Sequence, residues 1–220
     1  MSSNTPGLAP ARPAGRNHPR VFDADQVARF ECAGWEAYYD RRWLRVLRLM
    51  VQLNREQFGM SLPAALAAAV DIVRASRAFA PVDNDVPAAT AHLQRYYARA
   101  QRSAGLRSEP ASLAGLEMDY WIVHRRLAIA RRAAPDHSGD LGPMAAALAR
   151  LHAALFDASP EAIQRSAELR AQAAVAVDRI TGGYSQDIAA DWREVEDLLR
   201  RAYHCVVARE LRTDQPLSEQ

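Results

Sequence analysis

The sequence carries almost no signal for β-strands, and this absence constrains the fold more than any other feature. Alternating runs of β-branched residues are lacking, as are the Asn-Gly and Asp-Gly pairs that form hairpin turns. Alanine, leucine and arginine dominate instead, and all three favour helices. The chain is therefore expected to be all-α.

Glycine, proline and turn residues divide the chain into seven expected helices. Gly59 ends the first of them, which is predicted to run unbroken and to organise the domain. Ser61 with Pro63, and Ser159 with Pro160, are typical helix starts. Short connections favour antiparallel neighbours, so we expect a single helical bundle around the long first helix. The expected helices cover residues 23–58, 63–79, 88–103, 112–134, 141–157, 159–181 and 185–212.

The 220 residues are enough for one domain with a substantial core. We expect this domain over 22–213, with disordered tails at 1–21 and 214–220. The N-terminal tail is rich in proline and has no apolar run, so no secretory signal is expected. The longest uncharged run, 57–70, is shorter than the roughly 20 apolar residues of a membrane span. These features predict a soluble, cytoplasmic chain.

Charge and cysteine content exclude several functions. The formal net charge is +2, which gives no electrostatic argument for nucleic acid. All 28 basic residues are arginine, so neither a pyridoxal Schiff base nor a lysine-containing P-loop for nucleotides is expected. Cys32 and Cys205 lack zinc-site spacing, which predicts two free thiols and leaves a disulfide between them open. The expected partner is a small molecule or none, without a membrane, and a homo-oligomer stays open.

Polar residues on apolar helical faces are the best candidates for function, because burying them costs free energy unless they are paired or liganded. Glu117 and His124 project from the inner face of the fourth predicted helix, with Trp121 beside them. A carboxylate and an imidazole on one face could hold a metal or transfer a proton, so both are candidate catalytic residues. The alternative is that Glu117 pairs with an arginine and His124 bonds a carbonyl group.

The first predicted helix offers a third metal ligand, Glu31, to join Glu117 and His124. Trp35 and Tyr39 on the same helix would wall the site. Two turns of one helix span about 10 Å, so Glu117 and His124 share a ligand only if a neighbouring helix meets both. Such a site therefore requires the first and fourth predicted helices to pack directly.

Arg170 falls among the apolar positions of the sixth predicted helix. An inward arginine needs a carboxylate partner, and Glu117 and Asp178 are the natural choices. Alternatively, Arg170 binds a carboxylate or phosphate group of a ligand. The candidate ligand-binding residues are thus Trp35, Tyr39, Trp121 and Arg170.

Four parts of the chain together resemble a family of uncharacterised all-helical proteins of high-GC bacteria. They are Phe30–Tyr39, Phe58–Met60, Pro81–Pro87 and the pattern Glu117-x3-Trp121-x2-His124-Arg125. The resemblance spans most of residues 22–205. It implies an all-helical fold and brings no activity with it.

The Glu117-x6-His124 spacing is also similar to that on one core helix of heme-oxygenase-like dimetal oxidases. This similarity implies a redox site with iron or manganese. Those proteins also carry a His-x3-Asp pair on a late helix, which this sequence lacks.

Two hypotheses for function follow from these observations. The first is a metal-dependent or small-ligand-dependent helical enzyme of a redox type, with its site around Glu31, Glu117 and His124. The second is a non-catalytic interaction or structural module whose inward polar residues form buried Arg–carboxylate pairs.

Overall fold

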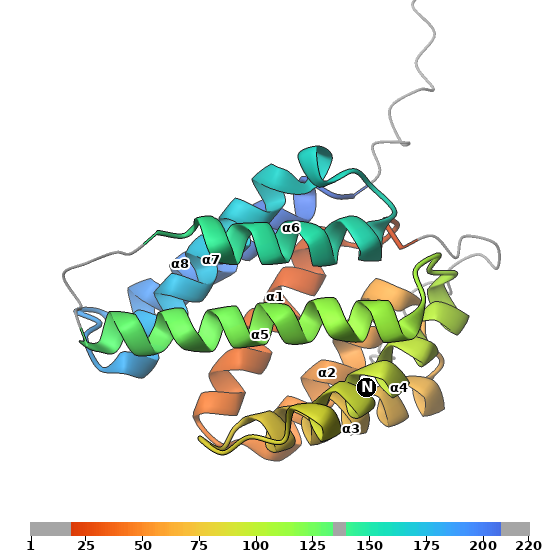
Figure 1. Ribbon diagram of the computed structural model, residues 1–220, viewed down its shortest axis with the longest axis horizontal. Coiled ribbons are helices and arrows are strands. Elements are labelled where there is room, and N and C mark those ends of the chain that lie inside the picture. The colour runs from red at the N-terminus through yellow and green to blue at the C-terminus, as the bar shows by residue number, and fades with distance from the viewer. Residues whose placement is uncertain (1–18, 134–139, 208–220) are drawn as a thin grey trace, which may run out of the picture.

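The computed structural model describes residues 19–133 and 140–207, which form eight α-helices and no strand (Figure 1). The all-α prediction is confirmed. The expected tail at 214–220, residues 1–18 of the other tail and residues 208–212 of the last expected helix lie outside the described residues. The helices are α1 (Ala24–Tyr39), α2 (Trp43–Phe58), α3 (Leu62–Phe79), α4 (Val86–Ala104), α5 (Pro110–Ala133), α6 (Gly142–Phe156), α7 (Pro160–Gly182) and α8 (Ile188–His204).

Short polar side chains cap the starts of four of the eight described helices. Asp23, Asp85, Ser159 and Asp187 each accept a hydrogen bond from a backbone N–H in the first turn of the helix that follows. At the other end of α2, Gly59 has the left-handed conformation that favours glycine, with φ of 63°. These local signals place most boundaries close to where the sequence predicts them.

The prediction of one unbroken helix over residues 23–58 is wrong, because this segment forms two helices. α1 ends at Tyr39, and the chain turns before α2 begins at Trp43. Within the turn, Arg41 has a φ of 58° and the Arg42 N–H donates to the Ala37 carbonyl at 2.8 Å. A left-handed arginine ends α1 without any glycine or proline. The described helices therefore number eight rather than seven, and the longest is α5, with 24 residues.

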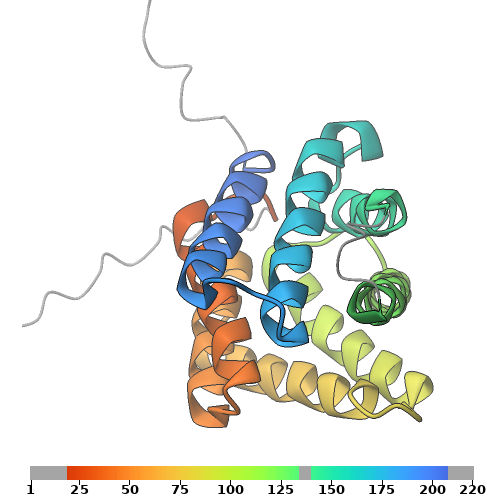
Figure 2. The same cartoon turned by 90° about the vertical axis from the view of Figure 1, so that its left-hand side faces the viewer.

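The helices pack in a closed ring. Each helix packs against the next along the chain, and α8 returns to pack against α1. Figure 2 shows this arrangement from one end, with α1 beside α8 and α5 beside α6. The two ends of the ring meet where the Arg20 Nε donates to the Val206 carbonyl at 2.7 Å.

The core contains many alanines, and on α7 they lie among larger apolar side chains. Ala167, Ala171 and Ala174 are almost fully buried, next to Leu169. Side chains this small let neighbouring helices approach closely. Polar side chains that enter such an interior therefore have little room for water around them.

No single helix within residues 19–133 and 140–207 is long and apolar enough to cross a membrane. α2 and α3 pass the same test of length and composition only as a pair, and they are bent by 119° at their break.

Candidate functional site

Glu31 lies at the centre of a buried ion pair. Arg170 of α7 donates to both oxygens of this α1 carboxylate, at 2.9 and 2.6 Å, and the Tyr203 hydroxyl of α8 donates to it at 2.6 Å. Glu31 and Arg170 are both buried. The expectation that Arg170 pairs with Glu117 or Asp178 is therefore wrong. The carboxylate partner of Arg170 is instead Glu31, which lies 139 residues earlier in the sequence.

The Arg170 guanidinium also packs over a ring. Its central carbon lies 5.2 Å from the centroid of Tyr203, and its Nε is buried without a hydrogen-bond partner. Burial alone would lower the pKa of Arg170, but the charge of Glu31 raises it well above its ordinary value. Arg170 therefore keeps its charge beside the Glu31 carboxylate.

Glu117 has partners of a different kind. The Tyr97 hydroxyl of α4 donates to one oxygen at 2.8 Å, and the Trp121 indole donates to the other at 2.7 Å. Burial raises the pKa of the Glu117 carboxyl above its ordinary 4.5, although both hydrogen bonds act to lower it. Glu117 is thus a carboxyl group held by neutral donors, close to the charges of Arg170 and Glu31.

His152 of α6 faces the same interior. Its side chain is buried, its Nδ1 has no hydrogen-bond partner, and its ring meets Phe156 edge-on at 5.5 Å. Burial, followed by the charge of Arg170, lowers the pKa of His152 well below 6.5. The imidazole is therefore neutral. Together these side chains form what we call the central polar cluster: Glu31, Tyr97, Glu117, Trp121, His152, Arg170 and Tyr203.

His124 belongs to a separate group of residues between α5 and α7. Its Nε2 lies 3.1 Å from Asp178 Oδ1, and Arg131 donates to Asp178 Oδ2 at 2.7 Å. The side chains of Arg131 and Asp178 are each only 5% exposed, and the His124 ring stacks on Tyr120 at 5.8 Å. The expected carbonyl partner of His124 is thus replaced by a carboxylate.

The aromatic residues predicted to wall the site have different surroundings. Trp35 is partly buried and packs on the core. Tyr39 is 45% exposed and meets Tyr38 edge-on at 5.3 Å. Trp121 is partly buried, lies 5.4 Å from the ring of Phe79 and donates to Glu117. Of these three, only Trp121 contacts another predicted site residue through a hydrogen bond in the described structure.

The structure does not bring Glu117 and His124 to one point with Glu31. α1 packs mainly against α2 and α8, whereas α5 packs mainly against α4 and α6, so the required direct packing is not met. Within residues 19–133 and 140–207, no three His, Cys, Asp or Glu side chains converge to hold a metal ion. The side chains nonetheless share one interior, because the charge of Glu31 acts on the pKa of Glu117.

The sequence analysis missed three partners of the predicted residues, namely Tyr97, Tyr203 and Arg131. Each lies on a buried helical face. A buried hydroxyl or guanidinium needs an acceptor, so its position on an apolar face is the signal that could have revealed it.

The two cysteines are free, as predicted. Cys32 is buried on α1, where burial raises the pKa of its thiol to about 12, and Cys205 is exposed just beyond α8. Neither thiol touches the central polar cluster through a described hydrogen bond, so neither adds a nucleophile there.

Comparison with known proteins gives no family for this chain. No family model matches it, and neither the curated proteins nor the solved structures yield a significant match.

Proposed function

We propose that this protein is a non-catalytic helical module that acts through its surface, while its polar interior sets how the helices pack. The supporting observation is that the chain itself occupies the groups expected to act on a ligand. Both oxygens of Glu31 and both oxygens of Glu117 accept hydrogen bonds from protein donors. These bonds leave fewer acceptor sites on each carboxylate for a metal or a substrate proton.

A metal-dependent or small-ligand-dependent redox enzyme is the second candidate, and one observation favours it. Burial raises the pKa of the Glu117 carboxyl, which suits a general acid. In this alternative, iron or manganese would be held by Glu31, Glu117 and His124, and binding would require α1 and α5 to approach each other, since the described residues do not bring these side chains together.

Metal analysis of untagged protein tests the proposal. The wild type, Glu117→Gln and a control, Asp119→Asn, are purified in parallel, and their iron, manganese and zinc contents are measured. Asp119 is an exposed carboxylate on the same helix, so its loss changes charge without touching the interior. Melting temperatures with and without each added metal complete the comparison.

If the protein is a non-catalytic module, we expect metal contents well below one per chain in all three proteins. We also expect no rise in melting temperature when metal is added. A content near one per chain that disappears in Glu117→Gln but not in Asp119→Asn would overturn it in favour of the enzyme.

A further inference from the structure

A hollow on the outer surface of the α3–α4 hairpin is lined almost entirely by basic side chains. Its volume is about 420 Å³, and its lining is Arg74, Arg77 and Ala78 of α3 together with His92 of α4. Arg74 and Arg77 lie one turn apart on one helix and are exposed. Neither forms an ion pair with a residue in the described parts of the chain.

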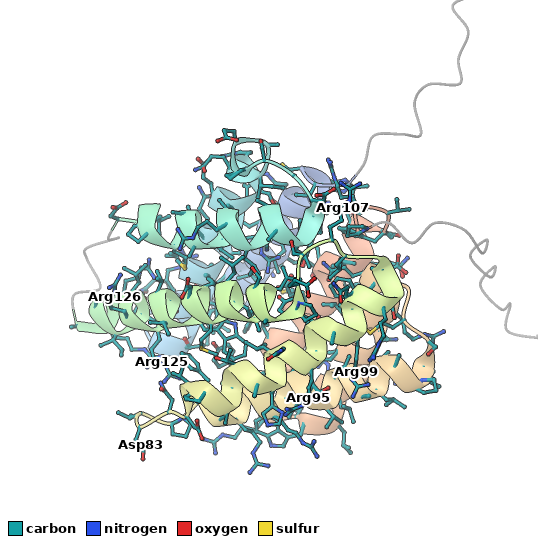
Figure 3. The ribbon with its side chains drawn as sticks, turned by 45° about the vertical axis from the view of Figure 1, so that its right-hand side comes forward. Asp83, Arg95, Arg99, Arg107, Arg125 and Arg126 are labelled. Carbon is teal, nitrogen blue, oxygen red and sulfur yellow. The ribbon has the colours of Figure 1, made fainter. Side chains whose placement is uncertain are left out.

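The edge of the hollow is built around a buried carboxylate. Asp71, only 4% exposed, accepts from Arg99 at 3.0 Å and from Arg95 at 3.5 Å. Arg95 also contacts His92 Nδ1. Figure 3 shows Arg95 and Arg99 on successive turns of α4. Asp71 therefore anchors Arg95, which contacts the His92 of the hollow, and Arg99 one turn further along α4. A single carboxylate leaves most of this positive charge uncompensated.

The distribution of charge along the chain places this hollow in a positive part of the molecule. Residues 41–133, which include α2 to α5, contain 15 of the 28 arginines but only 7 of the 26 acidic residues. The formal net charge of only +2 therefore conceals an excess of positive charge in residues 41–133. A surface of this kind attracts anions.

From this geometry we infer that the hollow binds the phosphate group of a small phosphorylated molecule. Guanidinium groups match phosphate oxygens with paired, charge-assisted hydrogen bonds. Arg74 and Arg77 of α3 line the hollow, and Arg95 of α4 contacts its His92. The hollow is open to solvent, so a small anion can reach both guanidinium groups directly. The inference rests on the proposed function, since it names the ligand class that the surface of the module takes.

The state of His92 is consistent with this role. Burial, followed by the charge of Arg95, lowers the pKa of His92 below 6.5, so its imidazole is neutral near pH 7. A phosphate dianion placed among these arginines would offset their charge. The resonances of the His92 ring are therefore a direct reporter of binding.

The experiment is an NMR titration of the full chain with inorganic phosphate, glycerol 3-phosphate and glycerol, at constant ionic strength maintained with chloride. The His92 resonance is assigned with His92→Gln. The test variant is Arg74→Gln with Arg77→Gln. The matched control is Arg150→Gln with Arg193→Gln, which removes two exposed arginines from α6 and α8.

Phosphate and glycerol 3-phosphate are expected to shift the His92 resonance saturably, and glycerol to leave it unchanged. The test variant should weaken binding about tenfold or more, and the control less than about twofold. Glycerol 3-phosphate binding more tightly than phosphate identifies an ester as the ligand, and equal affinities identify the free anion; both support the phosphate site.

A His92 resonance that does not move, or equal weakening in the test and control variants, would overturn the inference. So would a shift of the His92 resonance by a single-stranded oligonucleotide, titrated in the same way, without any response to phosphate. These results would leave the metal analysis unaffected, so failure here is distinguishable from failure of the proposed function.

Discussion

Two glutamates in one interior have opposite kinds of partners. Glu31 faces the guanidinium of Arg170 and forms an ion pair, whereas Glu117 faces the neutral hydroxyl of Tyr97 and the indole of Trp121. Burial raises the pKa of Glu117, and its neutral donors do not reverse that effect. The difference teaches that carboxyl groups in one interior can be held either by a cation or by neutral donors.

The largest expected effect comes from breaking the ion pair. Glu31→Gln leaves Arg170 as a buried cation without a carboxylate, and its cost to the free energy of unfolding should be about 3–5 kcal/mol. Urea unfolding followed by circular dichroism measures it. Glu36→Gln on the same helix, which removes an exposed pair with Arg45, should cost less than about 1 kcal/mol. Equal small losses in both variants would mean that Arg170 does not depend on Glu31.

The tyrosines that donate to Glu117 and to Glu31 provide a second comparison. Tyr97→Phe leaves one oxygen of Glu117 buried without its donor and should cost about 1–3 kcal/mol. Tyr203→Phe leaves Glu31 with both bonds from Arg170 and should cost about 1 kcal/mol. The same unfolding measurement ranks them, and the reverse order would contradict the assignment of partners.

Glu117→Gln should cost about 1 kcal/mol, because an amide oxygen still accepts one of the two hydrogen bonds. The sign of its pH dependence follows from the raised pKa. Above about pH 4.5 the folded state keeps a proton that the unfolded state has lost, so wild-type stability falls as pH rises toward the folded pKa.

The glutamine variant lacks this titration, so its deficit relative to the wild type should shrink with rising pH. Urea unfolding at a series of pH values detects the trend. A deficit that grows over the same range would show that the carboxyl is ionised in the fold.

The smallest effect concerns His152. Its lowered folded pKa means that only the unfolded chain takes up a proton just below pH 6.5, so stability is lost as pH falls through that range. His152→Met removes this contribution and should lose less stability than the wild type between about pH 7 and 5. Identical pH profiles for the two proteins would mean that the imidazole is protonated inside the fold.

Local chemistry made most helix boundaries predictable. Gly59, Ser61 with Pro63, and Ser159 with Pro160 lie where helices end or begin. The turn between α1 and α2 escaped prediction because Arg41 has no local preference for the left-handed conformation that it adopts. Residues 39–45 are exposed, and the turn is closed by the backbone hydrogen bond from the Arg42 N–H to the Ala37 carbonyl.

Part of the candidate site was also predictable from local sequence patterns. Helical periodicity placed Glu117 and Arg170 on inner faces, and both do reach the interior. It could not reveal that Arg170 pairs with Glu31, because the two residues are 139 positions apart and periodicity is a local property. The topology of the ring decides which inward groups meet.

The ring of helices closes at the contact between α1 and α8, which we call the seam. Its other main interfaces join helices adjacent in sequence or two apart, but the contact between α1 and α8 closes nearly the whole described chain. Local contacts form fast, and the entropic cost of closing a loop grows with its length, so we expect this closure to come last in folding. Glu31 and Tyr203 meet across the seam, and a closure in the wrong register would strand Arg170 without its carboxylate. The buried ion pair therefore penalises any closure that leaves its arginine without a carboxylate.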